Sequence, residues 1–392
     1  MRVLCLDPEG GYGGSSRSLY QSLRFVDNDR VQAEVWCRRA GPIQPLYDAI
    51  GVPVRVRPDM PTASSLPRLS RNLYVYGLAL WEHLRARAFC RELAEETGKR
   101  FDLVHFNHEG LFLLARWLRR QTRVPLTMHI RKSLTDTAFA RWQLRTAGRV
   151  ADHVVFITEN ERARFQEFGG RAPGTVIYNI AAPPEGPVEP HPQVPSDGRF
   201  KVACLSNYSW YRGTDRLVEV AGALAAAGHR GDVLFVVAGE MSLSRSLPGA
   251  LGRVGRRGGT LADYAASCGV SDMFLFLGHV SEPERVLAAS DALAKPTRED
   301  NPWGRDIIEA LAAGKPVLTV GSWDTFVTDW QTGILQEAFD AEALARAIVR
   351  LADDRALAAR LGAAGRERVM RLCNGPERAA ELLAVWESLA KH

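Results

Sequence analysis

The segment Glu299–Val317, with the sequence EDNPWGRDIIEALAAGKPV, contains residue types that suit binding of an anionic or sugar ligand. Asn301 and Pro302 are typical of a helix N-cap and of the first helical position, so a helix is predicted to begin there. Its first N–H groups would lack partners within the helix and could bind an anion or sugar hydroxyls. These N–H groups belong to Trp303, Gly304 and Arg305.

Glu309 lies roughly 12 Å further along the axis of this predicted helix. The residues around it are apolar, which indicates that most of the helix surface is packed: Ile307, Ile308, Leu311 and Ala312. A partly buried carboxylate needs a hydrogen-bonding partner, and the hydroxyls of a ribose would provide one. A plain surface carboxylate is the alternative. Gly314 and Pro316 predict the end of the helix and the start of a strand.

A second polar loop, SNYSWYRGTD from Ser206 to Asp215, is predicted to follow a strand and to precede a helix. It places Arg212 directly before Gly213. An arginine in such a loop suits a diphosphate, because its guanidinium is always charged and can donate two parallel hydrogen bonds to phosphate oxygens. A surface arginine without a ligand is the alternative.

The glycine-rich turn EGGYGGSSRS, residues 9–18, follows the first predicted strand and opens a helix. A dinucleotide fingerprint would need glycine where Ser16 stands, and the next strand ends in Arg38-Arg39 rather than in an acidic residue, which would suit NADP. The turn could instead let a substrate or phosphate approach backbone amides, or it could be merely a tight turn. The residues concerned are Gly13, Gly14 and Ser15.

Two histidines, His108 and His129, lie at or just after the ends of separate predicted strands. The carboxyl ends of parallel strands meet at one edge of a sheet, so these side chains could share a functional site. Two structural histidines with satisfied hydrogen bonds are the alternative.

The elements that would position these residues follow an α/β pattern, because short apolar or β-branched runs alternate with helical stretches. Strands are predicted at Arg2–Asp7, Gln32–Cys37, Asp102–Asn107, Pro125–Ile130, His153–Ile157, Thr175–Tyr178, Phe200–Leu205, Val233–Ala238, Phe274–Gly278, Ala292–Pro296, Pro316–Val320 and Gly333–Leu335. Helices are predicted at Ser16–Phe25, Leu73–Thr97, Leu111–Gln121, Ala138–Gly148, Glu159–Glu167, Asp340–Ala352, Arg355–Arg371 and Pro376–Leu389.

The proline-rich stretch Ala181–Asp197 lacks apolar periodicity and predicts a linker between two doubly wound parallel sheets. We therefore expect an N-terminal domain at residues 1–182, a linker at 183–198, a C-terminal domain at 199–372 and a last helix at 373–392 that packs back toward the N-terminal domain. Ligands bind at the carboxyl ends of such strands, so a cleft between two facing domains is the expected site.

The composition of the 392 residues, with 46% hydrophobic and 24% charged residues, is typical of a soluble globular protein. No apolar stretch is long enough to span a membrane. Six cysteines without C-x-x-C spacing argue against a zinc site and against a disulfide framework, and they favour the cytoplasm.

The net charge of +5 reflects arginines that gather in the N-terminal half. A solvated helix face is one explanation, and an anionic partner such as a membrane surface is the other. Nucleic acid is not expected, because no binding motif accompanies the charge. The apolar and basic segment Ser70–Arg87 is expected to pack as a helix, with peripheral membrane contact as the alternative.

Several stretches, taken in order over nearly the whole chain, resemble a GT-B glycosyltransferase of the large retaining family numbered four. They are GGSS after the first strand, T-x-H with His129, VIYNIA, WYRGTDRLVEVA, FLGHV, ASDALAKPT, NPWGRDIIEALAAGKPV and DWQTGIL. The resemblance implies two Rossmann-like domains facing a central cleft. It implies hexose transfer from a nucleotide-diphospho-sugar in the C-terminal domain to a glycan, lipid-linked or small-molecule acceptor in the N-terminal domain. Transfer would retain the anomeric configuration and need no metal or other cofactor.

The resemblance also implies roles for single residues. Glu309 matches the second Glu of the family's E-x7-E pattern and would hold the ribose. Asn301 stands where the first Glu would contact the transferred sugar, and Glu299 or Asp300 could compensate for the missing charge. His129 would orient that sugar or shield its anomeric centre. The catalytic residues implied are therefore His129, Asn301 and Glu309.

A second departure concerns the diphosphate. Asn207 stands where the family usually has Arg, Arg212 stands where it has Lys, and Arg305 could supply the missing charge. The donor-binding residues implied are Asn207, Arg212, Gly213, Pro302, Trp303, Gly304, Arg305 and Glu309. The residues implied for an acceptor or phosphate loop are Gly13, Gly14, Ser15 and His108.

Two other functions are compatible with parts of the sequence. The glycine-rich turn and Arg38-Arg39 would suit an NADP-dependent oxidoreductase. Asn207 and Asn301 would suit a sugar-nucleotide-binding protein without catalytic activity.

Overall fold

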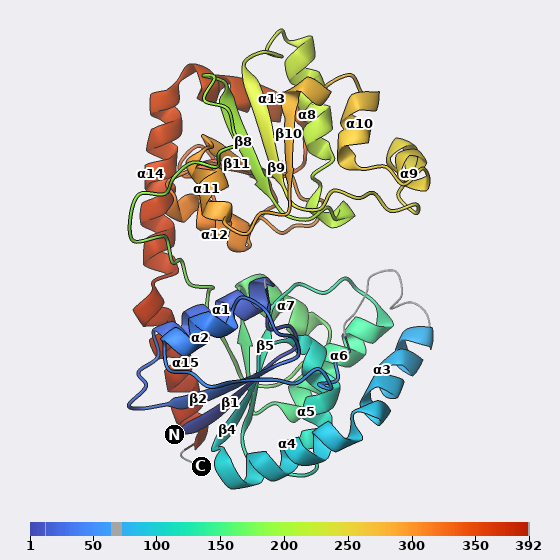
Figure 1. The fold of residues 1–392 in the computed structure, drawn as a ribbon, viewed down its shortest axis with the longest axis vertical. Coiled ribbons are helices and arrows are strands. Elements are labelled where there is room, and N and C mark those ends of the chain that lie inside the picture. Colours follow the sequence, from blue (N-terminus) through green and yellow to red (C-terminus); the bar gives the residue numbers. More distant parts are fainter. Residues whose placement is uncertain (12, 64–72, 391–392) are drawn as a thin grey trace. The chain divides into compact units, whose positions relative to one another are not determined.

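The computed structural model describes residues 1–11, 13–63 and 73–390. The chain divides into two compact units, which Figure 1 shows with their helices and strands. Unit 1 comprises Met1–Ile180 together with Cys373–His392, and unit 2 comprises Ala181–Leu372. The last helix of the chain thus belongs to the same unit as the first strand.

The described part of unit 1 forms a seven-stranded parallel sheet in the order β3-β2-β1-β4-β5-β6-β7. Its strands are β1 Arg2–Asp7, β2 Gln32–Cys37, β3 Val54–Val56, β4 Leu103–Phe106, β5 Leu126–Ile130, β6 His153–Phe156 and β7 Gly174–Val176. Its helices are α1 Gly14–Arg24, α2 Gln44–Ala49, α3 Leu73–Arg85, α4 Arg87–Arg100, α5 Phe112–Leu118, α6 Ala138–Val150, α7 Glu159–Glu167 and α15 Gly375–Ala390.

Each face of this sheet has its own apolar core. Alternate residues of β1 enter the two cores, since Leu4 packs with α4, α5 and α6 whereas Cys5 packs with α1, α2 and α15. Trp386 of α15 is fully buried in the second core, and its indole N–H donates to His105 Nδ1 of β4 at 3.4 Å. Figure 1 shows α15 beside α1 over the sheet. Residues from the end of the chain therefore complete the fold of unit 1.

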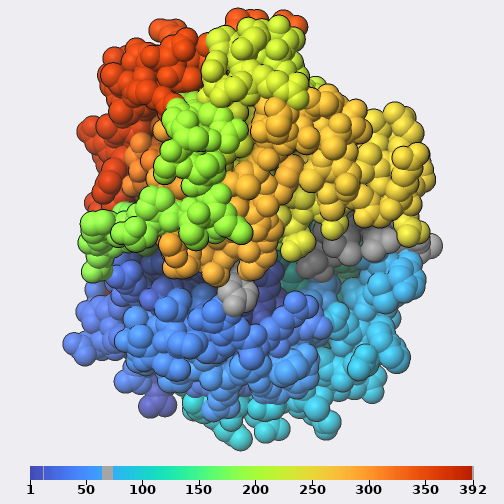
Figure 2. All heavy atoms as spheres, turned by 45° about the horizontal axis from the view of Figure 1, so that its top comes forward, coloured from blue at the N-terminus to red at the C-terminus, as the bar shows by residue number. Residues whose placement is uncertain are grey.

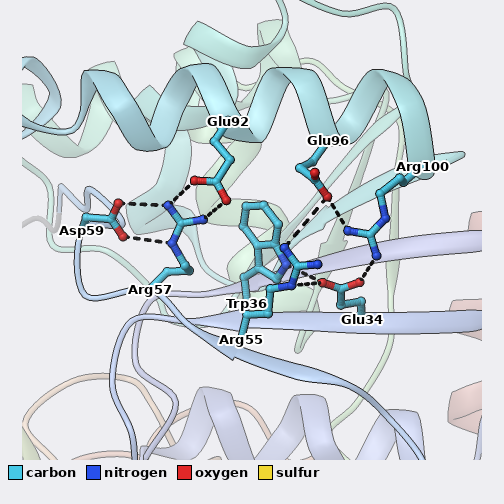
Figure 3. Close-up of polar contacts among 8 residues, drawn as sticks. All are labelled: Glu34, Trp36, Arg55, Arg57, Asp59, Glu92, Glu96 and Arg100. Atoms are coloured by element: carbon cyan, nitrogen blue, oxygen red, sulfur yellow. Dashed lines mark hydrogen bonds and ion pairs between the residues drawn. The ribbon is translucent and has the colours of Figure 1, made fainter.

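Two elements of unit 1 have no counterpart among the sequence predictions, namely α2 and the edge strand β3. β3 has only three residues, and they are partly exposed to exposed, so it is too short and too little buried to give a clear strand signal. The edge is held to α4 by charge (Figure 3): Arg57 pairs with Glu92 at 2.7 Å and with Asp59 at 3.0 Å. The Arg57 guanidinium also lies 4.7 Å from the Phe89 ring centroid.

The single helix predicted at Leu73–Thr97 is wrong. The chain breaks at Ala86, which has φ −87° and ψ 20° and is buried, and α3 and α4 are separate helices on either side of it. Burying both α3 and α4 against the same core requires a change of direction that a continuous helix cannot make. Residues 70–72 of the predicted apolar and basic segment lie outside the described residues.

The described part of unit 2 forms a six-stranded parallel sheet in the order β10-β9-β8-β11-β12-β13. Its strands are β8 Phe200–Leu205, β9 Val233–Ala238, β10 Phe274–Gly278, β11 Ala292–Lys295, β12 Val317–Val320 and β13 Gly333–Gln336. Its helices are α8 Arg216–Ala226, α9 Gly249–Arg256, α10 Leu261–Ser267, α11 Pro283–Ala288, α12 Arg305–Ala312, α13 Ala341–Asp353 and α14 Arg355–Leu372. The predicted α/β class with two doubly wound parallel sheets is confirmed.

The strand order of unit 2 reverses direction between β8 and β11, which are hydrogen-bonded neighbours although β9 and β10 separate them in sequence. In open parallel sheets, ligands bind outside the carboxyl ends of the strands at such a switch point. The loops that follow β8 and β11 are therefore the first place to look for a functional site within this unit.

Candidate functional site

The loops after β8 and β11 are bonded to each other. The carbonyl of Tyr211 accepts hydrogen bonds from the Thr297 hydroxyl at 2.9 Å and from the Arg298 N–H at 2.8 Å. The Arg216 guanidinium donates to the Thr297 carbonyl at 2.6 Å. A residue on one loop is therefore fixed relative to residues on the other.

A buried ion pair anchors the same junction. Arg298 Nη1 donates to Asp215 Oδ1 at 2.8 Å, and its guanidinium lies over the Trp210 ring, 3.6 Å from the centroid. Asp215 is almost fully buried, so an unpaired charge there would be costly. The sequence predictions assigned no role to Asp215 or Arg298. The sequence around Asp215 and Arg298 does not predict that they pair, because the ion pair forms only when the two loops meet in the folded unit.

Arg212 lies where the sequence placed it, at the end of the short 3-10 turn Trp210–Arg212 and exposed to solvent. Gly213 follows with φ 69°, and a Cβ there would lie 2.0 Å from the Pro296 carbonyl oxygen. Glycine is thus required by close approach of the two loops as well as by the left-handed backbone. Among the described residues, no carboxylate pairs with Arg212.

The predicted start of the helix at Asn301-Pro302 is wrong. α12 begins at Arg305, and its N-cap is Gly304 with φ 141° and ψ 171°. Pro302 and Trp303 are buried, and the Trp303 ring packs edge-on against Trp323 at a centroid distance of 5.2 Å. Burial of these rings holds the residues before Gly304 out of the helix, so Asn301 lies in a loop ahead of α12.

Asn301 remains notable in this loop, because its Oδ1 is buried and has no hydrogen-bond partner among the described residues. Asp300, one of the two acidic residues expected to compensate for Asn301, accepts from the Ser322 N–H at 2.7 Å. Asp300 is therefore engaged by the loop after β12, while the Asn301 amide oxygen lacks the partner that buried polar atoms normally have.

Lys295, at the end of β11, is a second residue that the sequence predictions missed. Its Nζ donates to the Trp303 carbonyl and lies 3.6 Å from Asp306 Oδ1. Burial lowers the pKa of the Lys295 ammonium, and the nearby Asp306 carboxylate opposes that shift. A Cβ on Gly304 would lie 2.9 Å from Nζ, so the glycine leaves space beside a buried cation at the start of α12. A lysine inside the apolar run ALAK was the available signal.

Glu309 is partly buried, with 23% of its side chain exposed, and it accepts a hydrogen bond from Arg305 Nη2 at 2.9 Å. The apolar neighbours named from the sequence, Ile307, Ile308, Leu311 and Ala312, are all buried. From the sequence, a ribose was predicted to hydrogen-bond to this carboxylate. In the structure, the carboxylate already accepts a hydrogen bond from Arg305. The pair at i and i+4 on one helix face holds both charged groups at the first turns of α12.

Asn207 is exposed, and its Oδ1 accepts from the Glu240 N–H at 2.9 Å. The Tyr208 N–H donates to the Glu240 carbonyl at 2.7 Å. The Asn207 side chain and the Tyr208 backbone therefore both connect the loop after β8 to the loop after β9 by hydrogen bonds. An arginine at the position could not accept that hydrogen bond.

In unit 1 the glycine-rich turn is organised around the end of β1. The Gly10 N–H lies within hydrogen-bond distance of Asp7 Oδ2 at 3.2 Å and of the Ser16 hydroxyl at 3.1 Å. Gly13 is the N-cap of α1, which begins at Gly14, and no side chain caps it. The Ser15 carbonyl accepts from Asn107 Nδ2 at 3.1 Å, so the turn is tied to the loop after β4.

His129 is buried and His108 is partly buried near this edge of unit 1. His108 Nδ1 accepts from the Gly110 N–H at 2.9 Å. Both ring nitrogens of His129 are buried without a hydrogen-bond partner among the described residues, and its ring packs edge-on against His105 at 5.7 Å. Burial lowers the pKa of both imidazoles, so each is neutral at pH 7.

A charged cluster beside these histidines was not found from the sequence. Glu109 is fully buried; its Oε2 accepts from the Arg131 N–H at 3.0 Å, and its Oε1 lies 3.8 Å from Lys132 Nζ. Arg131 Nε also donates to the Asn107 carbonyl at 3.2 Å. Cations at positions 131 and 132 thus follow the strand that carries His129.

Within the described ranges, no group of three or more His, Cys, Asp or Glu side chains is placed to hold a metal ion. In the same part of the chain, no helix combines the length and the apolar character needed to cross a bilayer.

The sequence matches two family descriptions. Residues 10–179 match "Glycosyl transferase 4-like domain", and residues 189–368 match "Glycosyl transferases group 1". Together the two matches cover most of both units.

Curated relatives include the GDP-mannose-dependent alpha-(1-6)-phosphatidylinositol monomannoside mannosyltransferase of Mycobacterium tuberculosis (strain CDC 1551 / Oshkosh), which is 30% identical over 250 residues. That match covers 59% of this chain and 60% of the relative. The lipopolysaccharide core biosynthesis mannosyltransferase LpcC of Rhizobium leguminosarum bv. viciae is 27% identical, over 62% of this chain and 65% of the relative. The chain therefore spans less than two thirds of the length of these relatives in either match.

Among solved structures, Anabaena Alr3699/HepE in complex with UDP-glucose matches with a TM-score of 0.73 and 22% identity, over 98% of this chain and 100% of that one. Sucrose-phosphate synthase from Thermosynechococcus elongatus matches with a TM-score of 0.73 and 19% identity, over 99% of each chain. Similarity at this level of identity concerns the fold.

Proposed function

The chain belongs to the glycosyl transferases group 1 family, the GT4 family of GT-B glycosyltransferases, and we propose that it transfers a hexose from a nucleotide-diphospho-sugar to an acceptor hydroxyl. The observation that carries this proposal is the set of groups at the switch point of unit 2. Arg212, Lys295 and the N-terminus of α12 supply positive charge, and Glu309 supplies a carboxylate further along the same helix.

These groups suit the leaving group of such a reaction. When the bond between the anomeric carbon and the diphosphate oxygen breaks, negative charge accumulates on the diphosphate. An exposed guanidinium at Arg212, an ammonium at Lys295 and the first N–H groups of α12 would stabilise that charge without a metal ion. Glu309 would accept hydrogen bonds from the ribose hydroxyls, with Arg305 holding the carboxylate in place.

The proposed transfer retains the anomeric configuration. The acceptor oxygen bonds to the anomeric carbon on the face that the diphosphate leaves, and the departing diphosphate oxygen takes the acceptor proton. The buried oxygen of Asn301 would accept a hydrogen bond from a hydroxyl of the transferred sugar, which would give it the partner that it lacks. His129 would act as a neutral ring that orients this sugar, because burial keeps its pKa well below the usual range.

For the acceptor, the names of the curated relatives point to glycoconjugates such as a phosphatidylinositol mannoside or a lipopolysaccharide core. We propose an acceptor of this lipid-linked class, bound by unit 1 through the turn at Gly13, Gly14 and Ser15 and through His108. A cytoplasmic protein that associates peripherally with the membrane would meet both a water-soluble donor and such an acceptor.

The oxidoreductase alternative is not favoured by the geometry of unit 1. Arg38 pairs with Glu82 at 2.6 Å and donates to the Thr62 hydroxyl at 2.9 Å, so it is already engaged. The sugar-nucleotide-binding alternative without catalysis is kept, since Asn301 offers an amide where a carboxylate would add negative charge near the reacting carbon.

Calorimetric titration with UDP, GDP and ADP, with their hexose conjugates and with the parent nucleosides tests the proposal. We expect at least one diphosphate series to bind, and Arg212→Ala to weaken binding of the diphosphate about tenfold or more while nucleoside binding persists. Arg346→Ala, at an exposed position of α13, serves as the control. Equal losses for nucleoside and diphosphate would contradict the role of Arg212. Transfer to lipid-linked and soluble acceptors is measured by mass spectrometry. Nucleotide binding without transfer to any of these acceptors would support the non-catalytic alternative.

The role of Glu309 is tested by Glu309→Gln, which keeps the shape of the side chain and removes its charge. Loss of a charged hydrogen bond to the ribose is expected to weaken nucleotide binding by about 1.5–3 kcal/mol. Glu342→Gln on the exposed surface of α13 is the matched control. An unchanged affinity in Glu309→Gln, with the fold intact by circular dichroism, would rule out the ribose contact.

A further inference from the structure

One side of helix α3 exposes large apolar side chains to solvent. On this side, the following residues have high exposed fractions: Tyr74 61%, Leu78 42%, Leu80 60%, Trp81 58% and Leu84 45%. Tyr74, Leu78 and Trp81 follow the i, i+4, i+7 spacing that places residues on one helix face, and Leu80 and Leu84 widen that face. Contiguous exposed apolar residues of this kind usually mark a surface that another molecule covers. We call these five residues the α3 apolar face.

The opposite side of α3 is fully used by the fold. Val75 and Ala79 are buried in the core of unit 1, and the Tyr76 ring packs against Phe139 of α6 at 5.2 Å. The acidic residue of the helix, Glu82, turns to this inner side, where Arg38 pairs with it at 2.6 Å. Packing therefore requires only the inner side of α3, and it also removes the one carboxylate from the outer side.

The exposed charges at the junction of α3 and α4 are positive, and the first exposed carboxylate of α4, Glu92, is paired with Arg57. Arg85, at the end of α3, lies with its guanidinium 5.8 Å from the Trp81 ring centroid. Arg87 and Arg91 are exposed on the first turns of α4. In the part of the chain that the structure describes, none of these three arginines forms an ion pair with a carboxylate. Figure 1 shows α3 and α4 joined end to end on the outside of unit 1, and Figure 2 shows residues of this blue-to-cyan range on the molecular surface.

We propose that the α3 apolar face and the adjacent arginines dock on the surface of a bilayer that contains anionic lipid. Tryptophan and tyrosine favour the headgroup region, leucines enter the acyl boundary, and arginines pair with lipid phosphates. A second copy of this chain fits less well, because a two-fold contact through this face would bring the arginines of both copies together. The inference gives a surface to the membrane association proposed above, but it does not depend on sugar transfer.

Vesicle flotation with the full chain tests this inference, with vesicles of phosphatidylcholine alone and of phosphatidylcholine mixed with phosphatidylglycerol. We expect wild type to float with the mixed vesicles, and Leu80→Glu and Trp81→Glu each to weaken this partition about tenfold or more, since each places a charge where an apolar side chain would enter the bilayer. Arg85→Ser is expected to weaken it roughly fivefold, and added salt to weaken the wild-type partition. Leu46→Glu, on α2 with 45% of the side chain exposed, is the matched control and should float as wild type does.

Three results would overturn the inference: wild type that does not float with anionic vesicles, face variants that float as well as Leu46→Glu, or self-association by sedimentation velocity that Trp81→Glu abolishes. Nucleotide binding by the same variants separates the two proposals. If Leu80→Glu and Trp81→Glu bind UDP or GDP as wild type does but do not float, membrane docking is supported whatever the transfer assay gives. If a glutamate variant fails to fold by circular dichroism, Leu80→Ser and Trp81→Ser replace it in the comparison.

Discussion

Single buried residues set how the stability of unit 1 depends on pH. Burial lowers the pKa of His105 to about 3 and that of His129 well below its usual range. In the unfolded chain both would titrate near about 6.5. Below that pH the unfolded state binds more protons than the native state, so the free energy of unfolding must fall as the pH is lowered from about 6.5.

We predict that His105 costs about 1.4 kcal/mol of stability between neutral pH and about pH 5.5, where its unfolded form is mostly protonated and its native form is not, and that His129 adds a cost in the same direction. His129→Gln should therefore lose less stability than wild type when the pH is lowered over this range. Urea unfolding at the two pH values measures the difference. His229→Gln lies in unit 2, so as the control it should leave the unfolding of unit 1 unchanged at both pH values.

Residues of the candidate site were predictable where their neighbours in the sequence indicated their position or burial. The partial burial of Glu309 followed from its apolar neighbours, and the place of Arg212 followed from the strand and glycine on either side. Asp215 was missed because its pair with Arg298 forms only when two loops meet in the folded unit, and Lys295 was missed although the lysine in ALAK was a signal. Asn301 was placed wrongly at a helix start, since burial of Trp303 outweighs the local preference of an Asn-Pro pair.

Among the elements, the junction of the loops after β8 and β11 depends on the absence of a side chain at Gly213. We predict that Gly213→Ala destabilises unit 2 and abolishes nucleotide binding, because its Cβ would lie 2.0 Å from the Pro296 carbonyl and separate the two loops. Gly228 has a similar backbone, with φ 86°, but open space around its Cα. Gly228→Ala should thus show only the backbone cost of about 1–2 kcal/mol and should bind nucleotide normally.

The edge of the unit 1 sheet offers a second prediction at the level of elements. Arg57, directly after β3, pairs with Glu92 of α4 (Figure 3). Its guanidinium also lies 4.7 Å from the Phe89 ring centroid, so Arg57→Ala should destabilise unit 1 by about 1–2 kcal/mol. Arg230→Ala removes a comparable pair with Asp272 at the open surface and should give no measurable change in thermal unfolding. Equal effects in the two variants would mean that the ring contacts of Arg57 contribute nothing.

Strands rich in apolar residues, such as β8 and β9, were predicted with their observed bounds, because their burial on both faces leaves a strong hydrophobic signal that only Lys201 interrupts. β3 and α2 were not predicted. A short edge strand and a helix of one to two turns have too little apolar periodicity to be recognised, and they are held by contacts with β2 and α1 rather than by their own propensity.

At the scale of the whole molecule, the two units contain separate cores, so we expect two unfolding transitions by calorimetry. Trp386→Ala should lower one transition, with a cost of about 3–5 kcal/mol, although residue 386 lies at the far end of the chain from β1. Leu361→Ala, in the core of unit 2, should lower only the other. A shift of both transitions by either variant would show that the units unfold together.

The assignment of α15 to unit 1 also bears on synthesis of the chain. Unit 2 is one continuous segment, whereas the apolar surface of α1 and β1 that α15 covers stays exposed until α15 has emerged from the ribosome. Unit 1 therefore starts to be synthesised before unit 2 but completes its fold after it. Its uncovered apolar surface must be kept from aggregating while residues 181–372 are translated. Emergence of α15, rather than emergence of the N-terminal half, is the event that completes the fold of unit 1.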